Sequence, residues 1–93
     1  MFVGIVRIEL HIPAARSLKD KRQVVRSLKD RIREQVRAAV SEVDHQDLWQ
    51  RAALGVAVVA PDATHARDLL QSVRRIVDQE WAATLTDWQE RLE

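Results

Sequence analysis

The stretch that decides the fold stands near the start of the chain, and it reads Phe2-Val3-Gly4-Ile5-Val6-Arg7-Ile8-Glu9-Leu10-His11-Ile12. Its side chains alternate between two sets. One set contains only apolar residues and one glycine, whereas the other changes from apolar to charged along the stretch. A period of two with β-branched residues predicts a strand with one buried face. Pro13 ends the strand because proline has no N–H group for a sheet ladder.

A helix is expected over residues 17–34. Ser17 and Asp20 form a capping-box-like pair, in which the hydroxyl accepts a bond from a free backbone N–H and the carboxylate offsets the positive helix end. The apolar residues recur at helical spacing, and neither Gly nor Pro interrupts the run. The residues that form this core stripe are Leu18, Val25, Leu28 and Ile32, with Val24 at its margin.

The remaining pattern predicts strands over residues 36–43 and 52–60 and a second helix from Asp62 to about Glu80. The strand over 52–60 is apolar on both faces, which is typical of the middle of a sheet. Between the strands, a polar turn leads into a short helical turn at Leu48-Trp49, where Trp49 is expected to plug the edge of the core. The tail allows two interpretations, because residues 84–88 suit a strand whereas residues 88–93 also suit a helical extension.

This order of elements predicts an α+β fold, the ferredoxin-like βαββαβ sandwich, as a single domain over residues 1–93. Its four-stranded antiparallel sheet carries both helices on one face. The strands follow the order fourth, first, third, second, so the two most apolar strands occupy the centre of the sheet.

Composition excludes several classes of protein. The chain has 93 residues, no cysteine, two Gly and two Pro. Disulfide frameworks, thiolate metal sites and glycine-rich phosphate loops are therefore ruled out, and no cofactor is expected. No apolar run is long enough to span a bilayer, and the first residues do not resemble a signal peptide. These features favour a cytoplasmic protein with no membrane partner.

Positive charge is concentrated in residues 16–37, which hold nine basic and three acidic groups, although the whole chain has a net charge of only +1. Five of the cations fall within an arc of about 80° on the first helix. Such a row can contact successive phosphates of an RNA strand without reading bases. The alternative is a solvated helix face that Asp30 and Glu34 partly neutralise. The predicted phosphate-binding residues are Arg16, Lys19, Arg22, Arg26, Lys29 and Arg33.

The face of the sheet that the helices leave open is predicted to be small and apolar. It has no aromatic residues for stacking bases, so it does not resemble an RNA-recognition platform. A flat apolar face suits packing against a second copy or another protein, and the alternative is a tolerated half-exposed surface. The predicted interface residues are Val3, Ile5, Ala53, Gly55, Ala57 and Val59.

Two further features have competing interpretations. Lys21 projects into the apolar arc of the first helix; we expect its stem to run along the edge of the core with the ammonium in water, and anion binding is the alternative. The second feature is a cluster of acidic and imidazole groups that favours a polar turn over a metal site. No histidine stands beside a plausible nucleophile, so neither catalytic residues nor a small-molecule substrate are predicted. The clustered residues are Glu42, Asp44, His45 and Asp47.

The chain resembles a known bacterial family. The resemblance is carried by residues 3–12, by the Arg-Ser-Leu-Lys-Asp-Lys-Arg motif over residues 16–22 with Val24-Val25, and by residues 41–52 and 54–59. These blocks resemble the DUF503, or YlxP-like, family. The resemblance implies a ferredoxin-like fold and a genomic context beside the genes for translation initiation factor two and ribosome-binding factor A. It supplies no catalytic residues.

The leading hypothesis is therefore a non-enzymatic accessory of translation or ribosome assembly that contacts rRNA or the ribosome through the basic helix. Its main rival is a homodimeric or protein-interaction module with no nucleic-acid contact. A weaker rival is a small enzyme that uses the turn between Asp44 and Asp47.

Overall fold

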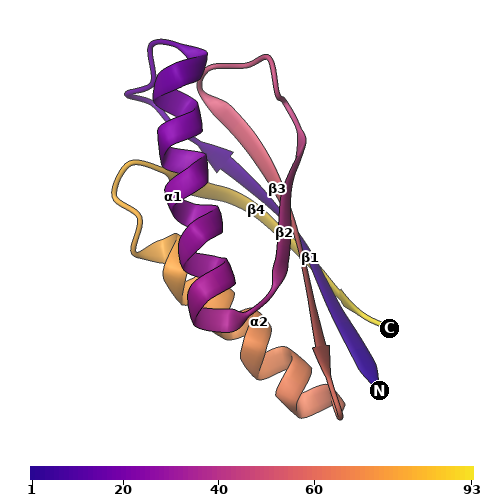
Figure 1. Cartoon of the computed structure of the whole chain (residues 1–93). Coiled ribbons are helices and arrows are strands. Elements are labelled where there is room, and N and C mark those ends of the chain that lie inside the picture. Colours follow the sequence, from indigo (N-terminus) through magenta and orange to yellow (C-terminus); the bar gives the residue numbers. More distant parts are fainter.

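The computed structural model describes residues 1–93 and has the element order βαββαβ. The strands are β1 (Phe2–His11), β2 (Ala39–Asp44), β3 (Arg51–Ala60) and β4 (Thr84–Leu92), and the helices are α1 (Leu18–Val36) and α2 (Ala63–Asp78). All strand pairs are antiparallel, and the strand order in the sheet is β2-β3-β1-β4. Both helices cover the same face (Figure 1). The predicted fold class and strand order are confirmed.

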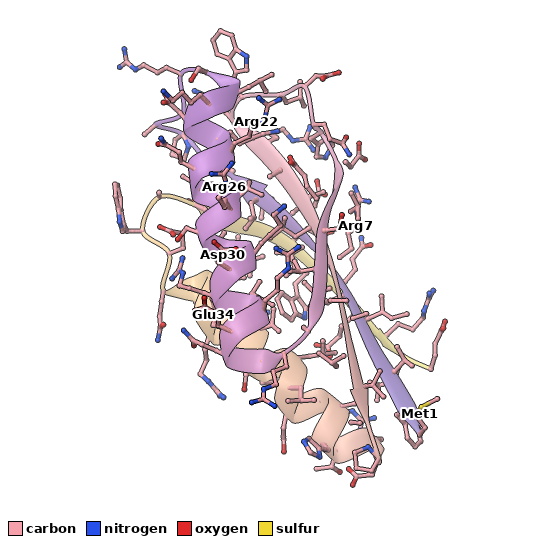
Figure 2. The ribbon with its side chains drawn as sticks, viewed as in Figure 1. Met1, Arg7, Arg22, Arg26, Asp30 and Glu34 are labelled. Carbon is pink, nitrogen blue, oxygen red and sulfur yellow. The ribbon has the colours of Figure 1, made fainter.

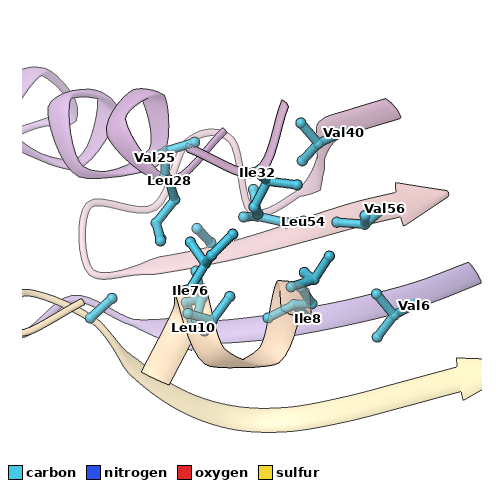
Figure 3. Packing of buried hydrophobic residues seen from close by; sticks show 14 of the residues in the cluster. Val6, Ile8, Leu10, Val25, Leu28, Ile32, Val40, Leu54, Val56 and Ile76 are labelled. Atoms are coloured by element: carbon cyan, nitrogen blue, oxygen red, sulfur yellow. The ribbon is translucent and has the colours of Figure 1, made fainter. Parts of the chain in front are cut away.

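The core lies between the helices and the covered face of the sheet (Figure 3). It is one cluster of 20 buried residues. The alternation in β1 is as predicted, because Val6, Ile8 and Leu10 are buried whereas the residues between them are partly exposed. Leu28 and Ile32 on α1 are completely enclosed, as are Leu70 and Val73 on α2. None of the helices combines the length and apolarity that crossing a membrane requires.

The second strand starts later than the sequence predicts, at Ala39 instead of residue 36. The helix α1 continues to Val36, and Arg37 ends it in a left-handed conformation with a φ of 57°. The N–H group of Arg37 donates to the carbonyl of Arg33 at 3.1 Å. A left-handed cap is a common helix ending, but it is usually formed by glycine or asparagine, so arginine gave no signal for it.

The tail forms one strand, β4, so the helical interpretation of residues 88–93 is wrong. Its alternation is poor because the register against β1 shifts between Glu9 and Leu10. Beyond that bulge, Trp88 and Leu92 pack against the core. The carboxylate of Glu90 lies between these two positions and accepts a hydrogen bond from Trp88 Nε1 at 2.9 Å.

Candidate nucleic-acid interface

The helix α1 begins with the predicted cap. The hydroxyl of Ser17 accepts a bond from the Asp20 N–H group at 3.1 Å, and the Asp20 carboxylate accepts one from the Arg16 N–H group at 3.0 Å. This end of the helix therefore already holds a negative charge of its own. Of the N–H groups in the first turn of α1, that of Asp20 is occupied by the Ser17 hydroxyl.

From Lys19 to Lys29, α1 presents unpaired cations. Lys19, Arg22 and Arg26 are exposed and Lys29 is partly exposed, and none of the four takes part in a salt bridge. Two shallow hollows lie between them. One, of about 280 Å³, is lined by Lys19, Arg22, Gln23 and Arg26. The other, of about 240 Å³, is lined by Arg22, Val25, Arg26, Lys29 and Glu42. Arg22 and Arg26 line both hollows.

Beyond Lys29, α1 is different, because acidic residues alternate with the basic ones. Figure 2 shows Arg22, Arg26, Asp30 and Glu34 following one another along the outward side of the helix. Arg33, one of the predicted phosphate-binding residues, donates to the carbonyl of Val40 at 3.0 Å and lies 3.9 Å from Asp30. The predicted row of cations is therefore free of salt bridges from Lys19 to Lys29, whereas Arg33 is engaged within the protein.

Lys21 is completely buried, so the expectation that its ammonium reaches water is wrong. Its Nζ donates to the carbonyls of His45, Gln46 and Arg51 at 2.7, 3.2 and 3.3 Å. It also lies 3.0 Å from the Glu42 carboxylate. These partners make burial of the charge tolerable, because they replace the water that the ammonium loses. Lys21 therefore holds the connection between β2 and β3 against α1.

The polar groups at one end of the open sheet face form ion pairs with one another. Arg7 lies 3.0 Å from Asp44 and 3.1 Å from Glu9, and Glu9 lies 2.9 Å from His45 and 3.3 Å from Arg51. Hydrogen bonds from the His45 N–H group and from Arg7 lower the pKa of Asp44, and the Asp44 side chain raises that of Arg7. Of the four residues considered as a metal cluster, Glu42, Asp44 and His45 therefore contact charged side chains of the chain itself.

The pKa of Glu9 is the result of opposing effects. Partial burial raises the pKa, but the hydrogen bond with His45 and the charges of His45 and Arg7 together lower it by more than burial raises it. The pKa therefore lies below its ordinary value of 4.5. Glu9 is thus an ionised centre around which three cationic or ionisable groups collect.

The open face contains most of the predicted interface residues, but not all of them are accessible. Val59 is 64% exposed and Val43 is 46% exposed, whereas Ala53 is completely buried and cannot contact a partner. Gly55 lies under Val43, because a Cβ at this glycine would be 2.9 Å from Val43 Cγ1. A shallow groove of about 320 Å³ remains, lined by Ile5, Ala39, Val40, Ser41, Val43, Gly55, Val56 and Ala57.

A further hollow, about 510 Å³, lies at the connection between β2 and β3, and of its lining residues only Asp47 was a candidate site residue from the sequence. It is lined by His11, Asp47, Leu48, Trp49, Gln50 and Arg51. Trp49 is 53% exposed and forms neither a core plug nor part of a helical turn. The sequence signal that could have indicated this hollow is the pair of large apolar residues, Leu48 and Trp49, inside an otherwise polar turn.

Comparison with known proteins agrees with this architecture. A family model described as "Protein of unknown function (DUF503)" matches residues 3–90. The uncharacterized protein YlxP of Bacillus subtilis (strain 168) is 32% identical, and the match covers 92% of this chain and 98% of that protein. A de novo designed protein with a ferredoxin fold, solved by NMR in solution, matches 100% of this chain and 88% of its own with a TM-score of 0.63. Its 18% identity makes it similar in fold alone. Because the family model and the Bacillus relative both span nearly the whole chain, the chain belongs to the DUF503 family of proteins of unknown function.

Proposed function

We propose that this protein is a non-enzymatic RNA-binding accessory of translation or ribosome assembly in the cytoplasm, and that it contacts RNA phosphates through the stretch of α1 from Lys19 to Lys29. The observation that carries the proposal is the group of four cations, Lys19, Arg22, Arg26 and Lys29, which have no acidic partner. Unpaired Lys and Arg side chains along a helix meet the phosphate backbone first and supply affinity without base preference.

Two further features support this proposal. The spacing of the cations along α1 brings them to one side of the helix, and the two hollows between them can receive phosphate oxygens. The family resemblance implies a genomic context beside genes of translation initiation and ribosome assembly. Lysine and arginine side chains that bind phosphates release the counterions that surround RNA, so this binding is strongest at low salt.

The test is reversal of charge on the helix. Changing Arg22, Arg26 and Lys29 together to Glu should abolish co-sedimentation with ribosomes and binding to RNA, whereas the fold should survive because these positions flank the core. A matched control changes Arg67, Arg75 and Arg91, which are exposed on α2 and β4, to Glu. Both variants alter the net charge equally. Equal loss of binding in both, or no loss in the helix variant, contradicts the proposal.

A second candidate function is self-association through the open sheet face. The observation that favours it is the apolar groove beside β2 and β3 together with the exposed Val59. Small residues such as Ala57 allow another surface to approach the sheet closely, and burial of such an area stabilises a dimer. Ala57→Arg should convert a dimer to a monomer in sedimentation, whereas Thr64→Arg on the exposed side of α2 should not. A wild-type protein that is monomeric at high concentration would exclude this candidate.

A further inference from the structure

The hollow at the connection between β2 and β3 has an unusual lining for a surface turn. Leu48 and Trp49 are 44% and 53% exposed, and the remaining lining residues are polar or charged. The hollow is a shallow depression of about 510 Å³ that is open to solvent, so a ligand would lie against it without being enclosed. A half-exposed indole beside hydrogen-bonding groups can stack on a flat heterocycle.

The backbone around Trp49 is held on both sides. Before it, the carbonyls of His45 and Gln46 accept bonds from Lys21 Nζ, and after it the carbonyl of Arg51 does the same. The side chain of Gln50 donates to the carbonyls of Pro13 and Ala15 at 3.1 and 3.2 Å. The turn is therefore preorganised, so a ligand that stacks on the indole does not have to order the backbone first.

These bonds also bring the hollow beside the beginning of α1. The segment that Gln50 contacts, residues 13–15, leads directly into Arg16 and Ser17. Figure 1 shows the connection between β2 and β3 next to the first turn of α1 at the same end of the molecule. The hollow therefore lies at the same end of the molecule as the beginning of α1.

We propose that Trp49 stacks on an unpaired base of a single-stranded RNA whose backbone continues along the stretch of α1 from Lys19 to Lys29. This inference rests on the proposed function and adds the class of RNA and a base-contacting residue to it. Aromatic side chains hold the bases of single strands by stacking, and this contact tolerates any base. A base inside a duplex is stacked on its neighbours and cannot offer its face to the indole.

The other residues of the hollow fit the same ligand. Arg51 and His11 supply donors beside the indole, and Asp47 supplies an acceptor for the amino groups of adenine, guanine or cytosine. Arg51 has 56% of its side chain exposed, although it also contacts Glu9. A purely apolar protein segment would leave these polar groups without partners, which is why a nucleotide fits the hollow better than an apolar peptide.

The experiment measures binding of a labelled 12-nucleotide single strand, and of the same sequence as a duplex, by fluorescence anisotropy. Trp49→Ala should weaken binding of the single strand by about tenfold or more, because stacking of one base is lost. Binding of the duplex should stay within about twofold of the wild type. Trp49→Phe should restore most of the single-strand affinity. Trp81→Ala is the matched control, because Trp81 is 91% exposed but lies in the connection between α2 and β4.

The outcomes separate this inference from the proposed function. Wild-type protein that binds neither RNA overturns both. A second outcome is that the triple variant at Arg22, Arg26 and Lys29 loses binding whereas Trp49→Ala keeps full affinity for the single strand. This result supports the phosphate contacts and overturns the stacking role of Trp49. Leu48 and Trp49 would then be a protein-docking surface. Equal weakening of single-strand and duplex binding in Trp49→Ala also overturns it. Circular dichroism establishes that each variant is folded.

Discussion

The ammonium of Lys21 lies 3.0 Å from the carboxylate of Glu42, inside a protein that leaves no part of the lysine exposed. A lysine has three N–H donors, and here three backbone carbonyls receive them. Glu42 Oε2 is within ion-pair distance but accepts no hydrogen bond. The carboxylate therefore acts as a countercharge, while the carbonyls provide the directed bonds that fix the backbone of residues 45–51.

Lys21→Met should destabilise the fold strongly. The substitution keeps most of the apolar stem but leaves three carbonyls and a partly buried carboxylate without their cation, which costs about 3–5 kcal/mol when one member of a buried pair is removed. Urea unfolding at neutral pH measures this loss. Lys19→Met, two residues earlier on the exposed side of α1, should change the free energy of unfolding by less than about 0.5 kcal/mol. Equal stability of the two variants would contradict a structural role for Lys21.

The two glycines should respond differently to alanine. A Cβ at Gly4 would lie 2.9 Å from Val58 Cγ2 and 3.1 Å from Leu70 Cδ1, and both neighbours are buried and cannot move away. Overpacking of this kind costs about 1–3 kcal/mol. A Cβ at Gly55 meets Val43, whose side chain is 46% exposed and free to shift, so Gly55→Ala should be close to neutral. Thermal unfolding of both variants tests this prediction. A larger loss of stability in Gly55→Ala than in Gly4→Ala would contradict it.

Stability should fall in acid because of Glu9 and Asp44. Both carboxylates have a pKa below their ordinary values of 4.5 and 3.8, so the unfolded chain takes up protons at a higher pH than the folded chain. The contribution of these two carboxylates to the free energy of unfolding is therefore complete above about pH 5. It is lost as the pH falls through their pKa values in the folded protein. The urea midpoint measured from neutral pH to about pH 3 should decline, and the decline should be smaller in Glu9→Gln. An identical acid profile in this variant would show that Glu9 is not responsible.

The salt dependence of RNA binding should identify the cations that contact phosphate. Each neutralised phosphate of a single strand contributes a slope of about −0.7 to log K against log salt. Arg22→Gln should make the slope less steep by about this amount. Arg33→Gln should leave it nearly unchanged, because the Arg33 guanidinium already donates to the carbonyl of Val40. Equal changes in slope for the two variants would place Arg33 among the contacts.

The sequence predicts the architecture well where side-chain periodicity is strong. The alternation in residues 2–12 and the apolar stripe through Leu28 and Ile32 identified the central strand and the packing face of α1. The caps at Ser17 and Asp62 were also predictable, because each side chain accepts a bond from the N–H group three residues later. These features depend on neighbours in the chain and therefore leave a pattern in it.

Contacts between distant residues leave no such pattern. The acceptors of Lys21 are carbonyls 24 to 30 residues away, and a carbonyl has the same chemistry in every residue type. The burial of Ala53 and the cover over Gly55 depend on a register shift in β2 between Glu42 and Asp44, which alternation alone does not indicate. Exposure of Trp49 likewise follows from how the turn is held, not from its own sequence.

The central position of β1 also bears on how the chain is completed during synthesis. Residues 2–11 leave the ribosome before both of their neighbours in the sheet, which are residues 51–60 and 84–92. Neither side of β1 can therefore be paired until more than half of the chain has emerged, and the second side waits for β4. Such long-range pairing slows folding, because a large loop must close before the contacts form. Among the strands of the sheet, β1 thus waits longest as an unpaired apolar segment, at the stage when a nascent chain is most exposed to aggregation.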